Sequence, residues 1–214
     1  MEKLEPENQF PIEQYPAGIT DLLNKENRPP WKGKESSKDA GLDFENMGLD
    51  LLKRHPKVFA ASFLSSEPDD KKKGADIITF LNSEKNLKLA IQTTATTNPE
   101  ERKEKLKKIM AKPVMPEIRD EKGQVIFKGV IPIAMGPCDK ITWGNALNKA
   151  KNEKQKDVSI FLSNMDERKF FEGIVISLKA TKEYAPADKN TFEEIIELLE
   201  EKILKPFREK QVVH

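Results

Sequence analysis

Residues 74–94 read GADIITFLNSEKNLKLAIQTT, and this stretch determines the fold expected for the chain. Both of its halves are rich in Ile, Leu and Thr, as strands are, and the turn residues Asn-Ser-Glu-Lys-Asn separate them. A symmetric turn sets an antiparallel register in which Ile77 faces Ile91, and the same register places Asp76 opposite Gln92. A slip of one residue would turn one strand's side chains to the other face, so the apolar pattern fixes this register.

The two polar residues at the open end of this hairpin are candidates for a metal site. Residues paired across an antiparallel ladder have Cβ atoms about 4.5–5.5 Å apart, so Asp76 and Gln92 are expected to converge. Alternation along the strand puts Thr94 on the same face as Gln92. Mg²⁺ takes oxygen ligands and commonly relies on one or two carboxylates plus a substrate phosphate. Glu45, on a helix expected upstream, could supply the second carboxylate.

Helices and further strands are predicted on both sides of the hairpin. Apolar residues recur at helical spacing over 41–55, and the apolar run 57–64 has the length of a strand. A helix over 99–110 begins with proline and acids and ends with lysines, in agreement with the helix dipole, and Thr96 and Thr97 are expected to cap it. The remaining predictions are an excursion over 112–129, strands over 130–136 and 157–162, a helix over 141–154, a helix or strand over 166–178, and a final helix over 191–207 with a Thr191/Glu194 capping box.

The order of these elements indicates the α/β class. Three strands form an antiparallel meander, and the helix between the third and fourth strands implies a parallel crossover. We expect an extended arm over 1–38 and a single α/β domain over 39–214, with a mixed central sheet of about five strands flanked by helices. The final helix has a broad apolar face that either covers the core or forms the seam of a homodimer, and its members are Phe192, Ile195, Ile196, Leu199 and Ile203.

Composition narrows the classes of function. The 37 Lys and Arg residues nearly balance the 36 Asp and Glu residues, so any attraction to nucleic acid or anionic lipid must be local. A single cysteine, Cys138, excludes an internal disulfide and fits a reducing cytoplasm, where we expect this protein. No apolar run reaches the ~20 residues of a membrane span, and we expect no signal peptide. With only His55 and His214, a zinc site or a hydrolase built on Cys138 or a serine ranks behind the hypotheses below.

Several of these features together resemble the PD-(D/E)XK phosphodiesterase superfamily, which includes restriction-endonuclease-like and Holliday-junction-resolvase-like enzymes. The helix with Glu45, the meander, the Gly-Ala-Asp at 74–76, the Ile-Gln-Thr-Thr at 91–94 and the following helix carry this resemblance. It covers about residues 40–136 as a nuclease-like core, and the C-terminal helical elements over 165–209 lie beyond it. The resemblance implies a metal-dependent nucleic-acid phosphodiesterase that uses Mg²⁺ or Mn²⁺. Asp76 matches the metal-binding aspartate, Gln92 the acidic position of the E-x-K half-motif, and Glu45 the helix glutamate.

The sequence departs from this family at Thr94, which stands where the family places its lysine. That lysine orients the attacking water and offsets charge on the phosphate, and a threonine hydroxyl supplies no charge. Lys88 is four residues from Gln92 on the same strand, about 13 Å at ~3.3 Å per residue, and Lys57 and Lys73 are the other candidates. Two functions remain open: a nuclease or its catalytically degenerate relative, and a non-catalytic module that binds nucleic acid or a protein partner.

Overall fold

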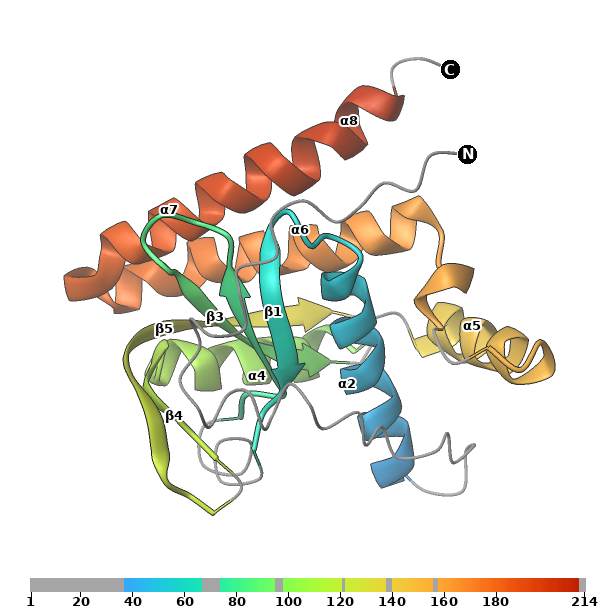
Figure 1. Ribbon diagram of the computed structural model, residues 1–214, viewed down its shortest axis with the longest axis horizontal. Helices are drawn as coiled ribbons and strands as arrows, with labels where there is room; N and C mark the ends of the chain where they lie inside the picture. Colours follow the sequence, from blue (N-terminus) through green and yellow to red (C-terminus); the bar gives the residue numbers. More distant parts are fainter. Residues whose placement is uncertain are drawn as a thin grey trace.

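The computed structural model describes residues 37–66, 74–94, 98–120, 122–137, 140–155 and 158–211. Within these ranges the chain is an α/β protein, with a mixed five-stranded sheet flanked by helices (Figure 1). The expected fold class is therefore confirmed. Predictions made for residues 1–36 of the arm, Lys73, Thr96, Thr97 and Cys138 lie outside the described residues.

The sheet has the strand order β1-β2-β3-β5-β4. The first three strands pair antiparallel, β3 and β5 pair parallel, and β4 and β5 pair antiparallel. Helix α4 (Pro99–Ala111) lies between β3 and β5 in the chain, which confirms the predicted parallel connection. The strands are β1 (Phe59–Leu64), β2 (Ile77–Leu81), β3 (Lys88–Thr94), β4 (Val114–Arg119) and β5 (Val125–Pro137).

The register predicted for the β2–β3 hairpin is confirmed along the length of the ladder. Ile77 pairs with Ile91, and the Leu81 N–H donates to the Leu87 carbonyl at 2.8 Å. Asn86 closes the turn with a φ of 50°, a left-handed conformation that asparagine tolerates better than most residues. The apolar pattern therefore selected the correct pairing.

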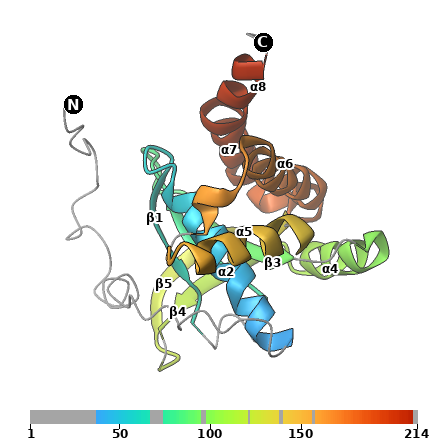
Figure 2. The ribbon, with the colours of Figure 1, turned by 90° about the vertical axis from the view of Figure 1, so that its right-hand side faces the viewer.

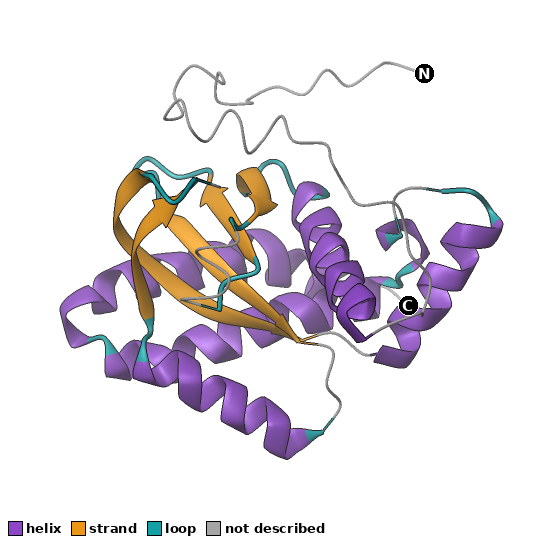
Figure 3. Cartoon of the chain, turned by 90° about the horizontal axis from the view of Figure 1, so that it is seen from below, coloured by secondary structure: helices purple, strands orange, loops and turns teal. Residues whose placement is uncertain are grey.

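Helices cover the sheet, and some of them extend past its edges (Figures 2 and 3). Alternate residues of the sheet enter two separate apolar clusters. Ile77 and Ile91 pack with residues of α2, α6 and α7, whereas Ile78 and Ala90 pack with α4, β4 and β5. The helices besides α4 are α2 (Ser37–Lys53), α5 (Lys140–Asn152), α6 (Asn164–Thr181), α7 (Lys189–Leu199) and α8 (Lys205–Gln211), and a π-helical turn (Glu200–Leu204) joins the last two.

The strand predicted over 157–162 is wrong, because a short 3₁₀ helix (Ser159–Phe161) occupies this segment. Its apolar residues Val158 and Leu162 are buried in the core, and an apolar run of this length does not distinguish a strand from a buried turn of helix. The fifth strand is instead β4, which pairs with an unexpectedly long β5 in the region predicted to be an excursion.

Helix boundaries also differ from the sequence predictions. Helix α2 runs from Ser37 to Lys53, whereas the sequence predicted this helix over 41–55. Asn98 caps α4, since its side-chain oxygen accepts from the Glu100 N–H at 3.0 Å. Helix α7 begins at Lys189 without the predicted capping box, but the apolar face predicted for it is buried in the core. The dimer seam remains a prediction.

Candidate functional site

Asp76 is the residue immediately before β2, where the ladder with β3 ends. Ile77 pairs with Ile91, and the Asp76 N–H also donates to the Ile91 carbonyl at 2.9 Å. Asp76 thus bonds to the same residue of β3 that pairs with Ile77. Ala75 packs in the cluster with Ile78, on the opposite face from Ile77, although Ala75 and Ile77 are two residues apart.

The Asp76 carboxylate bonds to Thr93. Its Oδ2 accepts from the Thr93 N–H at 2.6 Å and from the Thr93 hydroxyl at 2.7 Å. Thr93 faces α2, because a Cβ built on Gly48 would lie only 3.1 Å from the Thr93 methyl group. The carboxylate therefore lies on the α2 face of the sheet, where it fixes the end of β3 to the start of β2 through two charge-assisted hydrogen bonds.

Gln92 and Thr94 lie on the other face, because side chains alternate along β3. The Gln92 amide lies against Gly74, where an added Cβ would be 3.3 Å from Nε2. Gly74 has a φ of 66°, which favours glycine. The Asp76 carboxylate therefore bonds to Thr93, and it does not converge with the Gln92 amide as expected.

Thr94 is only 1% exposed, and its hydroxyl has no hydrogen-bond partner among the described residues. A buried hydroxyl without a partner costs on the order of 1–3 kcal/mol. The residue lies in the last pair of the parallel ladder, opposite Pro137 of β5. The position at which the family places an ammonium thus holds a buried, uncharged group.

Glu45 lies on the same face of the sheet as Asp76. It is half-buried on α2, one helical turn before Gly48, and residues three apart share a helix face. A Cβ on Gly48 would meet Ile77 at 2.9 Å, so this part of α2 lies over the start of β2. The structure therefore brings Glu45 and Asp76 to one face and leaves Gln92 and Thr94 on the other.

The predicted ligand set does not assemble around a single cation position. Asp76, Glu45 and Gln92 are divided between two faces, and Asp76 already accepts two hydrogen bonds at one oxygen. Within the described ranges, no group of three or more His, Cys, Asp or Glu side chains is placed to hold a metal ion. Two carboxylates on one face are the part of the predicted set that fits Mg²⁺.

The lysines considered as substitutes lie elsewhere. Lys88 begins β3, at the end of the strand opposite Thr94, and Lys57 is exposed in the loop before β1. The Lys88 ammonium lies over two aromatic rings, 4.0 Å from the centroid of Phe127 and 5.1 Å from that of Phe80. It therefore belongs to a different part of the molecule from Asp76.

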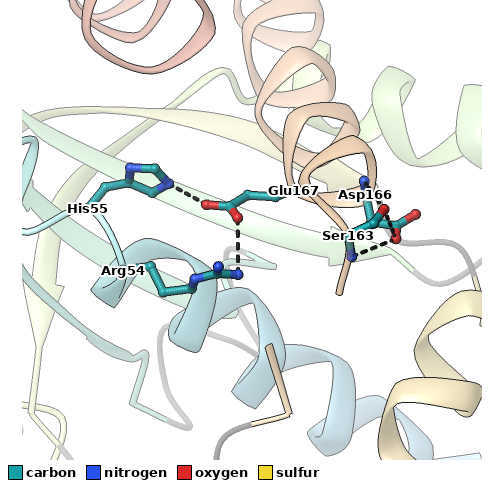
Figure 4. Close-up of polar contacts among 5 residues, drawn as sticks. All are labelled: Arg54, His55, Ser163, Asp166 and Glu167. Carbon is teal, nitrogen blue, oxygen red and sulfur yellow. Dashed lines mark hydrogen bonds and ion pairs between the residues drawn. The ribbon is translucent and has the colours of Figure 1, made fainter. Parts of the chain in front are cut away.

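A second polar cluster, which we call the Glu167 cluster, consists of Arg54, His55 and Glu167 (Figure 4). Glu167 is 3% exposed in the first turn of α6, and its carboxylate contacts Arg54 Nη1 at 3.0 Å and is bonded to His55 Nε2. The His55 ring also contacts Phe171 edge-on, with centroids 5.2 Å apart. This cluster joins the end of α2 to the start of α6.

The sequence did not reveal the Glu167 cluster, because His55 and Glu167 are 112 residues apart and no local pattern connects them. The only available signal was the Ser163 and Asp166 pair, which forms a capping box at the start of α6 and so fixes where Glu167 lies on the helix (Figure 4). The cluster positions α2, and with it Glu45 and Gly48, relative to α6.

Fold and site together define a class: an α/β protein with a helix, a three-strand meander, a second helix and a parallel strand, in which the Asp76 carboxylate lies immediately before β2. Comparison of the chain with family models, curated proteins and solved structures finds no match. In the part of the chain that the structure describes, no helix has the length and apolar character to cross a membrane.

Proposed function

We propose that this chain is a catalytically degenerate relative of the metal-dependent nucleic-acid phosphodiesterases, and that it binds nucleic acid in the cytoplasm without cleaving it. One observation carries this proposal. The Asp76 carboxylate, which would be the principal metal ligand, is bonded to the Thr93 N–H and hydroxyl just before β2. Its immediate role is to fix two strand ends.

Charge at the site supports a role without cleavage. Phosphodiester cleavage requires positive groups that stabilise charge developing on the phosphate, from a metal ion or from cationic side chains. The buried hydroxyl of Thr94 supplies no such charge, and the Lys88 ammonium lies at the far end of β3. Binding makes no comparable demand, because exposed cations contact phosphates without any role in bond breaking.

Helix α4 is the surface that we propose for contact with nucleic acid. It follows β3 directly, its only buried residue is Ile109, and its lysines extend to the last turn. Lys103 and Lys107 are exposed and one turn apart, so they share a flank of the helix. Such contacts release counterions from the nucleic acid, and binding should weaken as salt increases.

A second candidate function is an active phosphodiesterase, and the position of Glu45 favours it. Glu45 and Asp76 share a face of the sheet, and two carboxylates with a substrate phosphate are a common Mg²⁺ ligand set. These two residues would hold Mg²⁺ or Mn²⁺, and the ion when bound would supply activation of water for attack on phosphorus.

One experiment separates the two candidates. The full chain is incubated with single-stranded, double-stranded and branched DNA and with RNA, in Mg²⁺ or Mn²⁺, and cleavage is compared with that of Asp76→Ala and Glu45→Gln. We expect no cleavage above the level of either variant and no change in melting temperature on adding metal. Cleavage that both substitutions abolish would establish the active enzyme and overturn degeneracy.

Fluorescence anisotropy with the same nucleic acids tests the binding surface. Replacing Lys103 and Lys107 by glutamine should weaken binding and lower the salt slope by about two units, because each lysine neutralises one phosphate. The matched control replaces Lys149 and Lys151, which are exposed on α5, and should leave both quantities unchanged. Failure of the native chain to bind any of these nucleic acids would overturn both candidate functions.

A further inference from the structure

Lys88 is a buried amine in apolar surroundings. It is 8% exposed, and its Nζ lies 4.0 Å from the Phe127 ring centroid and 5.1 Å from the Phe80 ring centroid. The Nζ also donates to the Asn86 carbonyl at 2.6 Å. These contacts come from the turn before β3, from β2 and from β5, so three parts of the sheet enclose one amine.

No carboxylate lies within ion-pair distance of Lys88 in the described part of the chain, whereas Lys85, Lys107 and Lys179 each pair with a glutamate there. Aromatic faces attract a cation, but they do not replace the hydration that burial removes. Burial accordingly lowers the pKa of the Lys88 amine below its ordinary value of 10.5. A desolvated lysine in a hydrophobic environment is the nucleophilic form of this side chain.

We propose that Lys88 is a carbonyl-reactive amine, and that its aromatic enclosure takes a small uncharged aldehyde. In this reaction the Nζ lone pair attacks the carbonyl carbon and a carbon–nitrogen bond forms. The carbonyl oxygen then leaves as water with both amine protons, which gives an imine. Uncharged apolar aldehydes are favoured because the walls beside Nζ are the rings of Phe80 and Phe127.

This inference is independent of the proposed binding of nucleic acid. Lys88 and Thr94 are the first and last residues of β3, and six residues of strand span about 20 Å at ~3.3 Å per residue. A change in the reactivity of Lys88 therefore does not require a change in nucleic-acid binding at the Thr94 end of β3.

Competitive labelling of the full chain tests the proposal. Limiting acetaldehyde with cyanoborohydride ethylates amines through a reduced imine, and peptide mass spectrometry gives the ratio of modification at Lys88 to that at Lys85. Lys85 is the internal control, because it lies in the turn that leads into β3, its side chain is 69% exposed, and it pairs with Glu194 at 2.5 Å. Access favours Lys85, whereas the fraction of neutral amine favours Lys88.

We expect the Lys88-to-Lys85 ratio to exceed about three at pH 7 and to fall as the pH approaches 10. A ratio at or below one at pH 7, or a ratio that does not change with pH, would overturn the proposal. Lys88→Met keeps the length of the side chain and removes the amine. The yield of singly ethylated protein at pH 7 should fall in this variant, and an unchanged yield would also overturn the proposal.

Discussion

At the scale of single residues, the neighbour that a carboxylate finds determines what the carboxylate does. Asp76 has the position expected for a metal ligand, yet it accepts two hydrogen bonds from Thr93. Glu167, which no sequence pattern singled out, is the more deeply buried acid and pairs with both Arg54 and His55. Both acids connect different elements of the fold, so their removal should be measurable as lost stability.

Thr93→Val tests the bond between Asp76 and the Thr93 hydroxyl. The substitution keeps the β-branched shape and removes the donor, so we expect the free energy of unfolding in urea to fall by about 1–2 kcal/mol. Because Asp76 is partly exposed, we expect this loss to be smaller than the loss of a hydrogen bond to a fully buried charged group. In an Asp76→Asn background the same substitution should cost less. Equal losses in the two backgrounds would show that the hydroxyl does not stabilise the carboxylate.

Glu167→Gln tests the Glu167 cluster. The substitution removes the charge that Arg54 and His55 share, and we expect a loss of about 1.5–3 kcal/mol in the free energy of unfolding, because the carboxylate is buried. Glu172→Gln, on the same helix, removes a more exposed ion pair with Arg168 and should cost less than about 1 kcal/mol. Equal losses from the two substitutions would contradict the structural role of the cluster.

At the scale of elements, small residues allow α6 to approach the end of β5. A Cβ on Gly173 would lie 2.1 Å from the Pro137 ring, and a Cβ on Gly136 would lie 2.6 Å from Phe170. The sequence left the segment around Gly173 open between helix and strand, because glycine and β-branched residues disfavour helices. The structure shows a helix whose glycine is required by close packing.

Gly173→Ala should therefore separate α6 from β5. We expect a loss of about 1–3 kcal/mol in the free energy of unfolding, since the new methyl group meets a ring that cannot move away without shifting the strand end. Gly144→Ala, in α5, is the matched control because nothing lies within 4 Å of its added Cβ. It should stabilise the chain by about 0.5–1 kcal/mol through helix propensity alone. A gain at both positions would contradict the packing.

The elements also show what the sequence could predict. The hairpin register followed from apolar residues such as Ile77 and Ile91, because a slip would expose them. The bonds between Asp76 and Thr93 involve no apolar residue, so the apolar pattern did not signal them, and the expected convergence of Asp76 with Gln92 was wrong. Strand β4 was missed because Pro116 interrupts it, and proline within a run argues against a strand.

At the scale of the whole molecule, the sheet separates two apolar clusters, and Lys88 is a buried amine beside the second. The first cluster joins the sheet to α2, α6 and α7, and the second joins it to α4 and the β4–β5 hairpin. Lys88 contacts Phe80 and Phe127 of the second cluster. Because its protonation is linked to burial in this cluster, the stability of the whole fold should depend on pH through this one residue.

Lys88→Met measures this linkage. Burial holds the pKa of the Lys88 amine in the folded chain below 10.5, and the unfolded chain recovers this ordinary value. At a pH between the two pKa values, the unfolded chain therefore keeps a proton that the folded chain has released. Raising the pH through this window therefore favours folding of the native chain, by at most about 1.4 kcal/mol per pH unit, and has no such effect on Lys88→Met. Urea unfolding of both proteins at pH 7, 8, 9 and 10 gives the difference directly. We expect the native chain to gain stability relative to the variant as the pH rises, and a difference that stays constant would show that the ammonium remains charged between its two rings.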